Sequence, residues 1–192
     1  FVARRDGTRE WKDYTPYELR TIGSFVRLGW RDRAHEALDF FFADQQPRTW
    51  NQWAEVVSRT PRKPFFVGDL PHAWVGSDYV RSALDLFAYT RDLDEALVIA
   101  AGIPSDWLAG EGVSVANLRT PYGPLGYSLK ERGGRVLFTL SPQTKLPPGG
   151  VVLTWPYATP PGATTIDGKP AQWNGGELKI GRAGAKVEVA LR

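Results

Sequence analysis

The chain has 192 residues and contains neither cysteine nor methionine. Without cysteine it can form no disulfide, use no thiolate nucleophile and hold no zinc ion through sulfur. It begins at Phe1 and contains no initiator methionine. We therefore expect a processed, trimmed or recombinant piece of a longer polypeptide.

Long apolar runs and dense basic clusters are missing as well. No run reaches the roughly 18 apolar residues that a membrane span needs. The net charge is +3, and the positive excess is scattered over the second half of the chain. Because no block of Lys and Arg could follow a phosphate backbone, we expect neither nucleic acid nor a membrane as a partner.

The hydrophobic period of residues 1–94 is helical. Thr15, Pro16 and Glu18 have the pattern of a capping box and predict a helix that ends at Gly29. A second helix is expected from Asp32 to Pro47, with these residues on its inner face: Ala34, Ala37, Leu38 and Phe41. A short loop between the two predicts an antiparallel helical hairpin.

Two more helices are expected further along this part of the chain. A short helix or helical turn covers 50–57, and a proline-rich connection then continues to Pro71. Ser77 can cap the next helix, and Asp78 lies in its first turn, where the helix dipole favours negative charge. The apolar face of this helix is expected to comprise Val80, Ala83, Leu84 and Phe87.

From residue 95 to the end, short apolar segments alternate with turns. The expected strands are 97–101, 113–118, 125–130, 135–141, 151–155, 163–166, 172–173, 177–180 and 186–191. Gly133-Gly134 and Asp167-Gly168 are typical of tight hairpin turns. The order of expected helices and then expected strands therefore predicts an α+β chain, with antiparallel α-hairpins over 1–94 and an antiparallel β-sandwich over 95–192.

The stretch 50–78 is the richest in side chains that could act on a sugar. Glu55 and Asp69 are the carboxylate pair that we nominate for glycoside hydrolysis, and His72 could bind a hydroxyl or tune a neighbouring acid. The side chains nominated for substrate binding are Trp50, Trp53, Trp74 and Asp78.

Each of these residues also has a plainer interpretation. Glu55 could be a solvated or capping carboxylate, and Asp69 could form a turn by bonding its own backbone. The tryptophans could be packing residues. In the β part, five aromatic residues could form a sugar platform or simply fill the sandwich: Trp107, Tyr122, Tyr127, Trp155 and Trp173. We find no metal-ligand spacing, nucleophile elbow or phosphate-binding loop, so we expect no metal or cofactor.

The stretch from Leu97 to Thr120 joins the two parts. It comprises Leu97–Pro104 (LVIAAGIP), Ser105–Leu108 (SDWL) and Gly112–Thr120 (GVSVANLRT). This order of strand, Gly-Ile-Pro turn, Asp-Trp-Leu half-turn and strand resembles the joint in bacterial six-hairpin, (α/α)6-toroid glycoside hydrolases. There the last toroid helices lead into a C-terminal β-sandwich.

The resemblance implies that the chain is the C-terminal part of such a protein, with a glycan and the remainder of the parent polypeptide as its partners. A toroid needs about twelve helices, so the piece should lack much of the cleft and be inactive alone. In the family, loops that lead into the inner helices line the catalytic cleft. The resemblance therefore implies that Asp69, His72 and Trp74 face the cleft. Relatives are often exported, which favours a secreted or periplasmic location. A non-catalytic carbohydrate-binding or structural support module remains the alternative.

Overall fold

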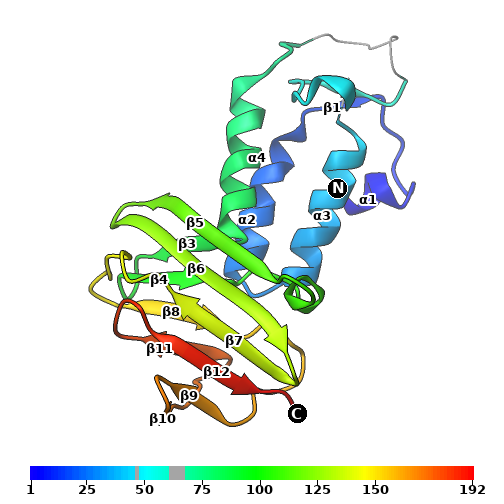
Figure 1. Ribbon diagram of the computed structural model, residues 1–192. Coiled ribbons are helices and arrows are strands. Elements are labelled where there is room, and N and C mark those ends of the chain that lie inside the picture. The colour runs from blue at the N-terminus through cyan, green and yellow to red at the C-terminus, as the bar shows by residue number, and fades with distance from the viewer. Residues whose placement is uncertain (46–47, 61–67) are drawn as a thin grey trace. The chain divides into compact units, whose positions relative to one another are not determined.

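The computed structural model describes residues 1–45, 48–60 and 68–192 (Figure 1). The chain divides into two compact units, Phe1–Asp85 and Leu86–Arg192. Helices dominate the first unit, and two mainly antiparallel sheets make up the second. The α+β class expected from the sequence is therefore confirmed. None of the described helices is long and apolar enough to cross a membrane.

The first unit is built on three longer helices, and α2 lies beside both α3 and α4 (Figure 1). Its α-helices are α1 (Val2–Arg5), α2 (Arg20–Arg27), α3 (Arg31–Ala43) and α4 (Ala73–Asp85). It also has the 3-10 turns η1 (Pro16–Leu19) and η2 (Arg48–Trp50) and the paired strands β1 (Asp13–Tyr14) and β2 (Val57–Ser58).

The first expected helix forms where predicted, but its first turn differs. Residues Pro16–Leu19 adopt a 3-10 turn before α2 begins. The expected capping box is wrong, because the Thr15 side chain makes no cap bond and Glu18 instead binds Arg4 at 2.8 Å. The carboxylate of Glu18 therefore ties η1 to the preceding segment.

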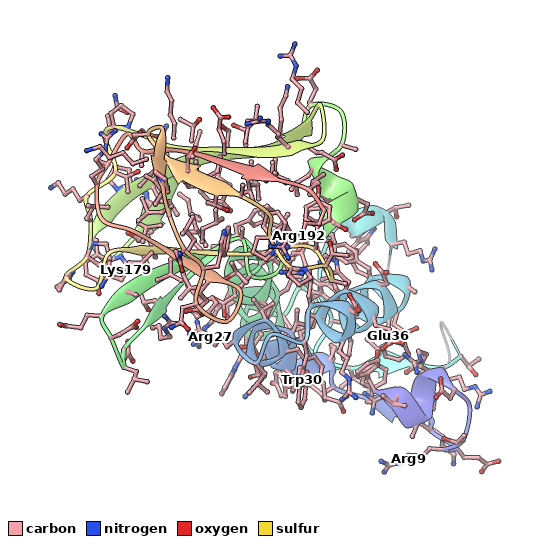
Figure 2. The ribbon with its side chains drawn as sticks, turned by 90° about the horizontal axis from the view of Figure 1, so that it is seen from below. Arg9, Arg27, Trp30, Glu36, Lys179 and Arg192 are labelled. Carbon is pink, nitrogen blue, oxygen red and sulfur yellow. The ribbon has the colours of Figure 1, made fainter. Side chains whose placement is uncertain are left out.

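The second expected helix is present as α3, but it begins at Arg31, with Asp32 in its first turn, and ends at Ala43, before the predicted Pro47. The short segment 28–30 joins it to α2. Trp30 precedes α3 on the surface of the unit, with the guanidinium of Arg33 4.9 Å from its ring (Figure 2). The buried side chains of the two helices are Ile22, Val26, Ala34, Ala37 and Phe41, whereas Leu38 is half-buried.

Helix α4 begins one turn earlier than the sequence predicts. The backbone N–H of Gly76 already donates to the carbonyl of His72, at 3.1 Å. The expected apolar face is also wrong, because Val80 and Leu84 are exposed. Two polar side chains turn inward instead. Ser82 donates to the Leu19 carbonyl, and Asp85 pairs with Arg27 at 3.1 Å.

The short helix expected over 50–57 does not form. Asn51 adopts a left-handed backbone conformation, with φ of 51°, directly after η2. Val57 and Ser58 then pair with Tyr14 and Asp13 as strand β2. Residue 47 and most of the proline-rich connection (61–67) lie outside the described residues.

The second unit contains β3–β12 and the 3-10 turn η3 (Ser105–Leu108). The strands are β3 (Ala88–Arg91), β4 (Ala96–Ile99), β5 (Val113–Thr120), β6 (Gly123–Arg132), β7 (Arg135–Leu140), β8 (Val151–Thr154), β9 (Thr164–Ile166), β10 (Lys169–Pro170), β11 (Glu177–Ile180) and β12 (Lys186–Ala190). One sheet has the order β10-β9-β12-β7-β6-β5, and the other has the order β11-β8-β4-β3.

The second unit contains two sheets (Figure 1), and side chains from both form one apolar core. Ile99 and Leu153 contribute to it from the smaller sheet, and Leu129, Phe138 and Val187 contribute from the larger one. Such a shared core is consistent with the expected β-sandwich. Within 86–192, all of which is described, one strand pair departs from the antiparallel expectation, because β4 and β8 run parallel.

Most of the expected strands are present within a residue or two of their predicted ends. The expected strand 172–173 does not form, and neither β3 nor β10 is predicted by the sequence. Both expected hairpin turns have positive φ at each of their central residues, Gly133, Gly134, Asp167 and Gly168. This is the backbone geometry that such turns require.

The shared core of the second unit should dominate its stability. Leu129 is fully buried in this core, whereas Leu93 is 95% exposed in the turn between β3 and β4. We expect Leu129→Ala to lower the free energy of unfolding by about 2–5 kcal/mol. The matched change Leu93→Ala should stay within about 0.5 kcal/mol. Urea unfolding followed by circular dichroism measures both, and equal effects would contradict the assignment of the core.

Two helical glycines of the first unit should respond oppositely to alanine. A Cβ on Gly23 would lie 2.6 Å from Asp85 Oδ2, whereas nothing lies within 4 Å of one on Gly76. We expect Gly23→Ala to destabilise the unit by about 1–3 kcal/mol, because the paired carboxylate would have to move. Gly76→Ala should stabilise it by about 0.5–1 kcal/mol, since alanine loses less backbone entropy on folding. Thermal unfolding of the two variants tests the difference in sign.

Candidate functional site

Two segments of the first unit are held together by their backbones. The N–H of Glu55 donates to the Asp69 carbonyl at 2.9 Å, and the N–H of His72 donates to the Trp53 carbonyl at 2.7 Å. We call this pairing of 53–55 with 69–72 the backbone clamp. It places the side chains of Glu55, Asp69 and His72 beside one another.

The carboxylate of Glu55 is fixed against the second segment. Its Oε2 accepts the backbone N–H of Asp69 at 3.1 Å. A Cβ on Gly68 would lie 2.4 Å from the same oxygen, so only glycine leaves room for the carboxylate here. Glu55 therefore acts as an anchor for the backbone at 68–69, and one of its oxygens is already engaged.

His72 lies at the N-terminus of α4 and is fixed by Tyr17. The Tyr17 hydroxyl lies 3.1 Å from His72 Nε2, and the two rings are 6.0 Å apart between centroids. The other ring nitrogen, Nδ1, faces Asp69 Oδ2 at 3.9 Å. This distance is longer than a hydrogen bond. The imidazole side chain is only 14% exposed, whereas that of Asp69 is 85% exposed.

Trp74 adds an accessible aromatic ring to this cluster. It is 61% exposed and lies 5.6 Å from the Tyr17 ring between centroids. The Arg20 guanidinium lies 5.1 Å from the centre of the Tyr17 ring and binds Asp78 at 3.0 Å. Asp78, which the sequence suggested for substrate binding, thus holds Arg20 in place.

The other two nominated tryptophans differ from one another in burial. Trp53 is buried and contacts the rings of Phe42 and Tyr79, with centroids 6.0 and 5.4 Å away. Its ring therefore packs the interior, as the plainer interpretation allowed. Trp50 is 59% exposed, at the end of η2.

The arrangement brings two carboxylates and an imidazole together. Ligand atoms of Glu55, Asp69 and His72 all lie within 4.8 Å of one another. That spacing is shorter than the roughly 6.5–9.5 Å between the carboxyls of an inverting glycosidase and nearer the roughly 5–5.5 Å of a retaining one. The carboxyl of Asp69 is the exposed member of the cluster. The same three side chains are of the types that ligate metal ions.

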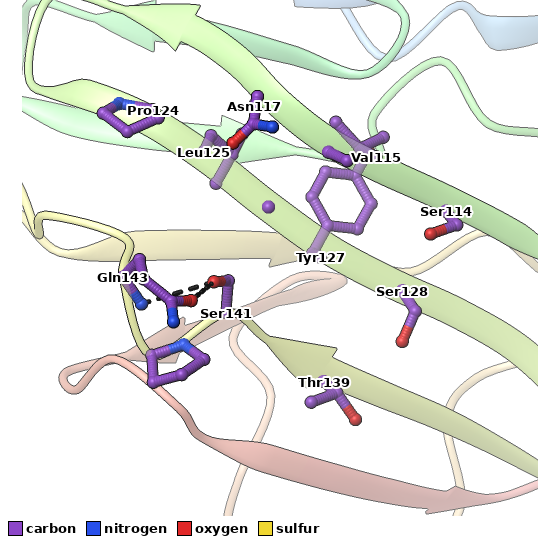
Figure 3. A pocket seen from close by; sticks show the side chains of 13 residues that line it. Ser114, Val115, Asn117, Pro124, Leu125, Tyr127, Ser128, Thr139, Ser141 and Gln143 are labelled. Carbon is purple, nitrogen blue, oxygen red and sulfur yellow. Dashed lines mark hydrogen bonds between the residues drawn. The ribbon is translucent and has the colours of Figure 1, made fainter.

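A second candidate site is a groove of about 400 Å³ in the second unit (Figure 3). A β-bulge between Val115 and Leu118 interrupts the pairing of β5 with β6, and Asn117 there has a φ of 57°. The missing side chain of Gly126 leaves the hollow open beside Ser141. Hydroxyl side chains line it: Ser114, Ser128 and Thr139 from three neighbouring strands, and Ser141 just after β7.

The five aromatic residues that could have formed a sugar platform do not form an exposed row. Trp155 and Tyr127 are buried in the core, and Trp173 donates from Nε1 to Thr164 Oγ1 at 2.8 Å while packing against the core. Tyr122 is half-buried, and Trp107 is partly exposed on η3. Most of these aromatic rings therefore pack in or against the apolar core of the second unit.

Sequence reasoning missed two residues of the first site. Tyr17 lies within the predicted helix start without a motif of its own, and no pattern marks Arg20. Tyr17 lies 55 positions from His72 along the chain. No local pattern connects residues at that separation, so only the fold could bring them together.

No protein-family model matches this chain, and no curated protein matches it in sequence. The resemblance of residues 97–120 to the joint of a toroid glycosidase therefore remains a proposal.

The anchoring role of Glu55 can be tested by a matched pair of substitutions. Glu55→Ala removes the acceptor for the Asp69 N–H, and we expect it to lower the free energy of unfolding by about 0.5–1.5 kcal/mol. Glu55→Gln keeps an oxygen acceptor and should remain within about 0.5 kcal/mol of the wild type. Thermal unfolding measures both, and an equal loss in the two variants would contradict the anchoring role.

Proposed function

We propose that this chain is the C-terminal part of a six-hairpin glycoside-hydrolase-like protein and that its first unit contributes a glycan-binding subsite. Asp69, His72 and Trp74 bind the sugar, and the chain alone binds without hydrolysing. The observation that carries the proposal is the exposed Trp74 ring beside the Tyr17–His72–Asp69 cluster.

This combination of side chains suits the chemistry of a sugar. A pyranose presents an apolar face, which an accessible aromatic ring such as Trp74 can cover. It also presents hydroxyls, which a carboxylate or an imidazole can bind. Asp69 is solvent-accessible, and His72 is held in one orientation by Tyr17.

The order of elements supports the link to the toroid family. Strand β4, turn η3 and strand β5 follow one another as in the joint that the sequence resembles. Three longer helices precede them, far fewer than the roughly twelve of a toroid. The remaining helices and most of a catalytic cleft would then belong to the remainder of the parent polypeptide. Glu55 and Asp69 stay candidates for catalysis in that larger protein.

The groove in the second unit supports the alternative of a carbohydrate-binding module. Strand register places Ser114 opposite Ser128 and Ser128 opposite Thr139, which makes a row of hydroxyls across β5, β6 and β7. Such a row can exchange hydrogen bonds with sugar hydroxyls. It lacks an exposed aromatic ring among its lining residues, so we rank it second.

A fluorescence titration with mono- and oligosaccharides tests the first proposal. We expect a saturable change in tryptophan emission for the wild type. Trp74→Ala should weaken binding at least tenfold, because the lost ring face is worth on the order of 1.4 kcal/mol or more. Trp50→Ala is the matched control, since Trp50 is equally exposed in the same unit, and it should bind as the wild type does.

The same titration separates the two sites. Binding that survives Trp74→Ala but is lost in the double variant Ser128→Val/Thr139→Val would move the function to the groove. The absence of binding in the wild type would contradict both sites and leave a structural support role.

A further inference from the structure

We propose that Glu55, Asp69 and His72 form a binding site for a divalent transition-metal ion of the zinc class. The sequence showed no metal-ligand spacing, because two of the ligands come from one side of the backbone clamp and the third comes from the other side. The inference goes beyond sugar binding and does not depend on it.

The donor set fits this class of ion. One imidazole nitrogen and two carboxylate oxygens are ligands that zinc accepts, and imidazole favours zinc and its neighbours over calcium and magnesium. Three protein ligands with a remaining position for water are also typical of open zinc sites.

The distances leave room for an ion between the ligands. His72 Nδ1 and Asp69 Oδ2 are 3.9 Å apart, too far for a hydrogen bond. Two metal–ligand bonds of about 2.0–2.2 Å place their ligand atoms about 3–4 Å apart around one ion. The full set lies within 4.8 Å, so a modest rotation of the exposed Asp69 side chain closes the site.

Tyr17 supplies the second observation that points to a ligand at Nδ1. Metal-bound histidines commonly donate from the other ring nitrogen to an oxygen, which fixes the tautomer and the ring orientation. Here His72 Nε2 lies 3.1 Å from the Tyr17 hydroxyl. In the tautomer with hydrogen on Nε2, this nitrogen donates to Tyr17 and the lone pair of Nδ1 faces Asp69.

Glu55 is held in place before any ion arrives. Its Oε2 accepts the backbone N–H of Asp69, and its carboxylate occupies the space that Gly68 leaves open. An oxygen of this fixed carboxylate completes the cluster. Two of the three ligands are thus oriented by contacts within the fold, and the third is exposed and free to rotate.

The test uses Co²⁺ as a spectroscopic probe and Zn²⁺ as its competitor, with no sugar present. We expect one equivalent of Co²⁺ to bind saturably, with visible absorption bands, and to be displaced by Zn²⁺ but not by millimolar Mg²⁺. Asp69→Asn, His72→Asn and Glu55→Gln should each weaken binding at least tenfold. Asparagine is a favoured residue at a helix N-terminus, so His72→Asn should preserve α4.

Two further variants distinguish a built site from incidental binding to a histidine. Tyr17→Phe removes the partner of Nε2 and should weaken binding by about 10–100-fold, as expected for an outer-shell contact. His35→Asn changes the other histidine of the chain, on α3, and should leave binding unchanged. Failure of the wild type to bind, or loss of binding only in His35→Asn, would overturn the proposal. Because no sugar is present, the result stands whether or not the glycan subsite is confirmed.

Discussion

The backbone clamp between 53–55 and 69–72 is the constraint on which the candidate site depends. Two main-chain hydrogen bonds and the Glu55 carboxylate bring the two segments together. Backbone groups make these bonds largely independently of side-chain identity. The clamp therefore sets the spacing of the side chains, and the residues at these positions decide what the site binds.

Tyr17 connects this clamp to the helices. Its ring contacts Trp74 and the Arg20 guanidinium, while its hydroxyl meets His72. Arg20 is in turn paired with Asp78 on α4. An aromatic side chain with a polar end can serve an apolar contact and a hydrogen bond at once. One residue at the start of the helical part thus supports both the proposed sugar contact and the proposed ion site.

Local patterns predicted the second unit better than the first. Most strands and turns could be predicted because local sequence alone favours them. Alternating apolar residues favour strands, and the pairs Gly133-Gly134 and Asp167-Gly168 favour tight turns. In the first unit, tertiary contacts decided the outcome. Ser82 and Asp85 turn inward because the Leu19 carbonyl and Arg27 receive them, and hydrophobic periodicity cannot foresee such partners. Glu55, Asp69 and His72 could be nominated from their residue types. The sequence could not predict that these three side chains lie beside one another or that Tyr17 contacts His72.

The bulge in β5 has a consequence for the surface of the second unit. Strand β5 ends the larger sheet on one side, and β10 ends it on the other. An open sheet edge can recruit a strand from another chain and start aggregation. The bulge interrupts the straight edge of β5, and β10 is only two residues long and contains Pro170, which has no N–H to donate. The same irregularity that shapes the groove thus disfavours strand addition at the β5 edge of the larger sheet.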